Sequence, residues 1–195
     1  MPQQRGEETR SRILDAAVRK FAMAGYDAAS VDDICAEAGV SKGAFYHHFP
    51  TKQSIFLALM QGWLAMIDTG MDAVQGTNVP DTLIKMTDLL PGVFAAAEDR
   101  LPMFLEFWLQ ASRDETVSKA MIAPYHQYQA RFASLIEKGI HEGTLKPTDP
   151  QVAAQVIVSL AVGLVLQGIL DPLAANWEKT ARQSMRILMN GLACS

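Results

Sequence analysis

The residues best suited to chemistry in this sequence are hydrogen-bond donors, and they gather between positions 30 and 52. Hydroxyl, ammonium, phenol and imidazole groups occur there together, and all of them can donate to phosphate oxygens or to base edges of a nucleic acid. Small residues at positions 43 and 44 keep the surface low enough for a backbone to approach a base pair. We therefore expect a DNA contact surface formed by Ser30, Ser41, Lys42, Gly43, Tyr46, His47 and Lys52.

The charge distribution supports a nucleic-acid partner, although the whole chain has a formal net charge of -4. Residues 1–55 carry seven Lys or Arg and seven Asp or Glu, so the remaining residues carry ten and fourteen and hold the whole deficit. No acidic residue occurs from Ala38 to Ile67. Because Lys and Arg supply much of the affinity for DNA by neutralising phosphates, this acid-free stretch predicts a local positive face on an acidic protein.

Three short helices must position these groups. Apolar residues at spacings of three and four predict an amphipathic helix over 9–24. Ser30 opens a second helix with the pattern of a capping box, and Gly39 ends it. Ser41 is the expected N-cap of a third helix over about 42–48. A helix, a turn and a second short helix form the layout of a helix-turn-helix, whose second helix enters the major groove.

The rest of the chain also predicts helices. A long helix capped by Thr51 is followed by helical segments near 81–97, 101–111, 117–142, 150–170 and 173–192. No stretch alternates apolar and polar residues with a period of two, so no sheet is expected. We expect an all-α fold of about nine helices, with a helix-turn-helix DNA-binding domain at 1–52 and a helical effector-binding and dimerisation domain at 53–195.

Residues 8–60 closely resemble the DNA-binding domain of the tetracycline-repressor (TetR) family of transcriptional regulators. Three motifs carry the resemblance, namely Ile13-Leu14-Asp15-Ala16-Ala17 with Phe21 and Gly25-Tyr26, Ala36-Glu37-Ala38-Gly39-Val40-Ser41-Lys42-Gly43, and Tyr46-His47-His48-Phe49 with Lys52. The resemblance implies a homodimer built through the last two helices, an operator with two-fold symmetry, and release from DNA when an effector binds. It implies a ligand-responsive regulator, commonly a repressor.

The same resemblance implies individual roles. Ser30 and Ser41 correspond to phosphate-contacting N-caps, Lys42 and Tyr46 to groove or backbone contacts, and His47 and Lys52 to phosphate contacts. Gln53 and Ser54 depart from the charged residue that often follows this lysine in the family. Additional backbone contacts are expected from Arg5, Arg10 and Arg12. The alternative is purely structural, with the serines as helix caps, Tyr46 packed and the lysines as solvated surface charges.

The region from Leu83 to Gln129 carries many large, soft and aromatic side chains, which predict an adaptable apolar cavity for a small hydrophobic or aromatic effector. The expected effector contacts are Met86, Phe94, Met103, Phe104, Phe107, Trp108, Tyr125, His126 and Gln129. An ordinary helical core explains the same composition. Polar Glu106 and Gln110 are further candidates to orient a ligand. No cofactor is expected.

Residues 152–170 contain no charge, and their length is close to that of a membrane-spanning helix. Asp-Pro pairs flank the segment in place of the Lys and Arg typical of membrane proteins. We favour a helix that is buried on nearly all sides and covered by a second copy of the chain, with Gly163 and Gly168 permitting close approach. The resemblance to the TetR family implies that this homodimer forms through the last two helices, at about 150–192.

An enzyme and a structural helical interaction protein are the alternatives to a regulator. The sequence has no glycine-rich phosphate loop, no Gly-x-Ser-x-Gly elbow and no His-Glu-x-x-His motif. His47 and His48 are adjacent and have no Cys or carboxylate at metal-ligand spacing, so no metal site is expected. Two distant cysteines and a polar N-terminus without a signal segment predict a cytoplasmic protein.

Overall fold

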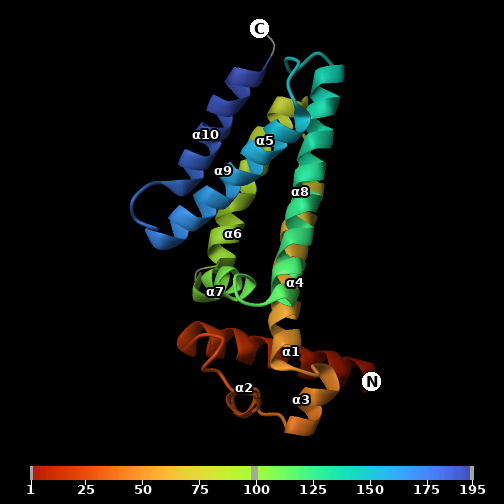
Figure 1. The fold of residues 1–195 in the computed structure, drawn as a ribbon, viewed down its shortest axis with the longest axis vertical. Coiled ribbons are helices and arrows are strands. Elements are labelled where there is room, and N and C mark those ends of the chain that lie inside the picture. Colours follow the sequence, from red (N-terminus) through yellow and green to blue (C-terminus); the bar gives the residue numbers. More distant parts are fainter. Residues whose placement is uncertain (1, 98–100, 194–195) are drawn as a thin grey trace. The chain divides into compact units, whose positions relative to one another are not determined.

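A computed structural model describes residues 2–97 and 101–193, without side-chain placement for 2–3, 94–97, 101–104 and 169. Over these residues the chain forms ten α-helices, one short 3-10 helix (η1) and no strand, which confirms the all-α prediction (Figure 1). The elements are α1 (Pro2–Ala24), α2 (Val31–Ala38), α3 (Lys42–His48), α4 (Lys52–Ala73), α5 (Val79–Met86), η1 (Thr87–Leu89), α6 (Leu90–Ala97), α7 (Leu101–Ala111), α8 (Glu115–His141), α9 (Pro150–Leu170) and α10 (Trp177–Leu192).

The segment expected to be one helix over 81–97 is divided into α5, η1 and α6. Pro91 lies in the first turn of α6 and explains the division. Proline has no N–H to donate, and its ring clashes with the carbonyl four residues earlier, here that of Thr87. The chain tightens into a 3-10 turn before this position and resumes as α6, whereas α8 continues through its internal Pro124.

The chain divides into two compact units. The first comprises Met1–Ala65 with Ala97–Ala120, and the second comprises Met66–Ala96 with Met121–Ser195. Two helices, α4 and α8, therefore begin in the first unit and end in the second. These units are defined by which residues pack together. The predicted boundary between a DNA-binding domain and an effector-binding domain at residue 52 stays a prediction.

Aromatic side chains form the centre of the first unit. The Phe56 ring on α4 lies 4.7 Å from the Tyr26 ring and 5.9 Å from the Phe21 ring on α1. Phe107 of α7 packs on the other side, with its ring centroid 4.6 Å from that of Phe56. Aromatic pairs of this kind contribute about 0.5–1.5 kcal/mol beyond the area that they bury. These contacts fasten α1, α4 and α7 together beneath the predicted helix-turn-helix.

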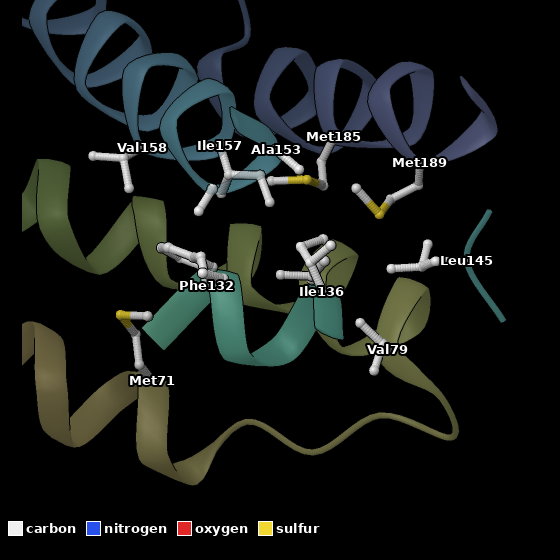
Figure 2. Packing of buried hydrophobic residues seen from close by; sticks show 13 residues of the cluster. Met71, Val79, Phe132, Ile136, Leu145, Ala153, Ile157, Val158, Met185 and Met189 are labelled. Carbon is white, nitrogen blue, oxygen red and sulfur yellow. The ribbon is translucent and has the colours of Figure 1, made fainter. Parts of the chain in front are cut away.

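In the second unit, α8 packs against α9 and α10 around a core rich in methionine (Figure 2). Phe132 and Ile136 point from α8 toward Ile157 of α9 and toward Met185 and Met189 of α10 (Figure 2).

One glycine permits a particularly close approach in this core. A Cβ atom on Gly139 of α8 would lie 2.6 Å from Leu145 Cδ1, a distance that real Cβ atoms essentially never show. A larger residue at position 139 would therefore require the Leu145 side chain to shift.

Two helices in the described part of the chain are long and apolar enough to cross a membrane by length and composition, at Lys52–Ala73 and Pro150–Gly168. Core helices of soluble proteins pass the same test. The most apolar stretch of the second helix is only 39% buried within one copy of the chain. The expected burial on nearly all sides is thus incomplete in a single protomer.

Candidate nucleic-acid interface

Helix α3 is anchored by one residue and presents its neighbours to solvent. Phe45 is fully buried and holds the helix to the first unit, whereas Tyr46 is 51% exposed. Ser41 has an extended backbone, and its Oγ accepts the N–H of Ala44 at 3.1 Å, which confirms it as the N-cap. Lys42, Gly43 and His47 are also exposed. The donors predicted on this helix are therefore accessible to a ligand in solvent.

The turn before α3 depends on the left-handed conformation of Gly39. Its backbone has φ +61° and ψ +42°, as the sequence predicts, because glycine adopts this region without a steric penalty. Nη2 of Arg12 reaches the turn from α1 and donates to the carbonyl of Ala38 at 2.5 Å and to that of Gly39 at 2.9 Å. Arg12 uses this nitrogen to hold the end of α2, and its expected contact with the DNA backbone stays a prediction.

A capping box opens α2, as predicted. Ser30 Oγ accepts the N–H of Asp33 at 3.1 Å, and Asp33 Oδ2 accepts the N–H of Ser30 at 3.1 Å. The Ser30 hydroxyl also donates to Asp33 Oδ2. These hydrogen bonds from Ser30 hold the pKa of Asp33 below its ordinary value. Ser30 is exposed, but its hydroxyl hydrogen is already used within the box, so its phosphate contact stays a prediction.

Lys42 is paired with Asp32 across the turn, with 2.6 Å between Nζ and Oδ1. The hydrogen bond to Asp32 raises the pKa of Lys42. Both side chains are more than 60% exposed, and exposed ion pairs contribute only about 0–1 kcal/mol. A phosphate or a base edge can therefore compete with Asp32 for this ammonium group.

The ammonium group of Lys52 binds backbone carbonyls in this structure, and its expected phosphate contact stays a prediction. Its Nζ donates to the carbonyls of Tyr26 at 2.7 Å, Ala29 at 3.0 Å and Asp27 at 3.2 Å. The same nitrogen lies 4.4 Å from the centroid of the Tyr26 ring, a cation–π distance. An ammonium group has three hydrogens to donate, and here each has an acceptor.

Sequence reasoning missed a polar junction between the α1–α2 loop and α7. Gln110 is buried, and its side-chain amide donates to Glu106 Oε1 at 2.8 Å and to Asp27 Oδ1 at 3.4 Å. Arg113 lies 3.7 Å from the other oxygen of Asp27. Gln110, a predicted ligand-orienting residue, binds the loop that leads into α2, and Glu106, the other one, accepts a hydrogen bond from Gln110. Only their polarity within an apolar helix hinted at a special role.

The predicted effector residues fall in different places. Phe107 is 5% exposed and belongs to the aromatic centre of the first unit, next to the half-exposed Trp108. The predicted contacts in the second unit are Met86, Tyr125, His126 and Gln129, of which His126 is exposed. The side chains of Phe94, Met103 and Phe104 lie outside the described residues. The effector site stays a prediction.

Two sequence models of protein families match the chain. Residues 13–59 match "Bacterial regulatory proteins, tetR family", and residues 86–192 match "BetI-type transcriptional repressor, C-terminal". The second match alone spans more than half of the chain. Together the two matches include the helix-turn-helix and most of the helices that follow it.

Relatives and solved structures agree with these matches. The HTH-type transcriptional regulator UidR of Escherichia coli is 23% identical, over 97% of this chain and 95% of its own. The A-factor receptor protein of Streptomyces griseus is 26% identical, over 98% of this chain and 66% of its own.

Two solved structures share the fold. A TetR transcription regulator from Haloarcula marismortui has a TM-score of 0.83 at 20% identity, over 96% of this chain and all of that one. A putative transcriptional regulator from Saccharomonospora viridis, solved with choline, has a TM-score of 0.81 at 21% identity, over 97% of this chain and all of that one. The helix-turn-helix geometry, the two family matches and these likenesses agree, and the chain belongs to the TetR family of transcriptional regulators.

Proposed function

We propose that this protein is a cytoplasmic, ligand-responsive repressor that binds a palindromic operator as a homodimer and is released by a small effector. The observation that carries the proposal is the exposed face of α3. Its donors stand on a helix that is capped by Ser41 and anchored by Phe45, and it follows a turn held by Arg12. A fixed helix with exposed donors and a low surface at Gly43 suits the major groove.

A second copy of the chain is proposed to cover α9 and α10. Val152 and Val156 lie one turn apart on α9 and are 54% and 44% exposed, and Ile187 on α10 is 65% exposed. A Cβ atom on Gly163 would meet nothing closer than 4.0 Å within the protomer, so a partner helix has room to approach there. Removing an apolar helix face from water lowers the free energy. An isologous dimer through about 150–192 would bury this face and would be stabilised by its burial.

The effector is proposed to be small and hydrophobic or aromatic, because the expected contacts are mainly methionine and aromatic side chains. A quaternary ammonium compound is a second candidate, since the similar regulator from Saccharomonospora viridis was solved with choline and aromatic faces attract such cations.

Release would follow from a change in spacing between the two reading heads. Two-fold operators place half-sites about 34–36 Å apart, so both α3 helices must keep that separation to bind together. A ligand that favours one of two dimer shapes would shift the population away from the DNA-binding one. Helix α4 is the proposed lever, because it begins in the first unit and ends in the second.

The first test is a mobility-shift titration with the promoter region next to the protein's own gene and with a scrambled duplex of equal length. We expect preference for the promoter, two protomers per site, and a loss of preference in Tyr46→Ala. Met23→Ala is the matched control, because Met23 is 83% exposed in the same unit but lies on α1. Equal affinity for both duplexes would overturn the proposal.

The second test adds choline and a panel of aromatic and hydrophobic compounds to the preformed complex. Release of the DNA together with a raised melting temperature of the free protein is expected for an effector. If no compound changes either quantity, the proposed ligand class is wrong, although DNA binding itself is unaffected by that result.

A further inference from the structure

Lys52 occupies a position where a lysine needs unusual partners. It is the first residue of α4, and the N-terminus of a helix carries a partial positive charge that repels a cation. The three carbonyl oxygens of Tyr26, Asp27 and Ala29 converge on its ammonium group and supply the compensating negative dipoles. The aliphatic stem and the Tyr26 ring complete the contact.

The loop that provides these oxygens sets the start of the helix-turn-helix. It runs from Gly25, at φ +79°, to Ser30, the N-cap of α2. The three carbonyls converge on the ammonium group only while the loop keeps this conformation. A partly buried carbonyl that loses its hydrogen-bond donor destabilises the folded protein. Lys52 therefore holds the beginning of α2 to α4, while Arg12 holds its end at Ala38 and Gly39.

We infer that Lys52 is a positioning residue of the DNA-reading head and not a contact to phosphate. Its ammonium group fixes the α1–α2 loop, and through α2 it fixes the angle at which α3 meets DNA. The inference rests on the proposed function, because it assigns Lys52 a part in operator binding. It also makes a separate statement about the folded protein, which can be tested without DNA.

Two substitutions separate the roles. Lys52→Arg keeps a positive charge that can reach a phosphate, but a planar guanidinium cannot place three donors of one nitrogen on three converging carbonyls. Lys52→Met removes the charge and keeps the stem. Lys179→Met on α10 is the matched control, because it removes one exposed positive charge from the second unit.

The measurement is the affinity for the promoter duplex as a function of salt, by fluorescence anisotropy. We expect both Lys52 variants to lose about tenfold or more in affinity and to keep the salt slope of the wild type. A phosphate contact requires the opposite pattern, in which Lys52→Met lowers the slope by about 0.9 and Lys52→Arg restores slope and affinity. That pattern would overturn the inference and leave the proposed function intact.

Amide hydrogen exchange of residues 25–30 supplies the readout without DNA. If Lys52 holds the α1–α2 loop, both Lys52 variants should exchange faster there than the wild type and Lys179→Met. Failure of both Lys52 variants to fold also supports this role, because a surface phosphate contact is not needed for folding. Unchanged exchange in both overturns it. If the wild type shows no sequence preference for DNA, the proposed function fails, and the exchange result alone decides the role of Lys52.

Discussion

Replacing Gly39 with alanine is expected to destabilise the first unit for two separable reasons. Alanine in a left-handed conformation costs about 1–2 kcal/mol, and Gly39 has φ +61°. The new Cβ atom would also lie 2.9 Å from Nη2 of Arg12, so the guanidinium has to shift, and we expect it to lose its bonds to the carbonyls of Ala38 and Gly39. These charge-assisted bonds are partly exposed, so we assign their loss about 1 kcal/mol. The expected total is about 2–3 kcal/mol.

A double-mutant cycle in urea unfolding at neutral pH tests both terms. Arg12→Ala alone is expected to cost about 1 kcal/mol, and the double variant about as much as Gly39→Ala alone, because the Arg12 bonds can be lost only once. Gly62→Ala on α4 is the control, since its Cβ meets nothing within 4 Å and alanine suits a helix interior better. Strict additivity would refute the steric reasoning, and a cost of Gly39→Ala below about 0.5 kcal/mol would refute the backbone reasoning.

Three further outcomes follow from the same structure. Gly43→Ala is expected to leave stability intact, because its Cβ meets only Ser41 Oγ at 3.8 Å. The same variant is expected to weaken operator binding about tenfold, as measured by fluorescence anisotropy. Unchanged binding would exclude Gly43 from the groove. Asp33→Asn should reduce stability at pH 7. Because the folded pKa of Asp33 is lowered, this difference should shrink as the pH falls below about 4, and a difference in urea unfolding that does not change with pH would contradict the capping role. Val156→Glu on the exposed face of α9 should convert the proposed dimer to a monomer in light scattering, and an unchanged dimer mass would place the interface elsewhere.

The helix-turn-helix could be predicted from sequence because its signals act over three or four residues. Ser30 and Ser41 satisfy the free N–H groups of the helix that each one starts, and Gly39 supplies its own backbone conformation. Such interactions depend on neighbours along the chain, and the structure confirms all three. The break before Pro91 was also encoded locally, but the apolar periodicity across it suggested one continuous helix.

The partners of the long cationic side chains could not be predicted in the same way. Lys52 and Arg12 each reach carbonyls 23 to 27 positions away, and Gln110 reaches Asp27 across 83 positions. The contact of Phe107 with Phe56 in the aromatic centre likewise joins residues that are far apart along the chain. The sequence by itself determined where the two helices of the helix-turn-helix begin and end and that donors lie near residue 42. Tertiary structure decided which donors remain free, because an ammonium or guanidinium group binds whichever oxygens the fold brings within reach.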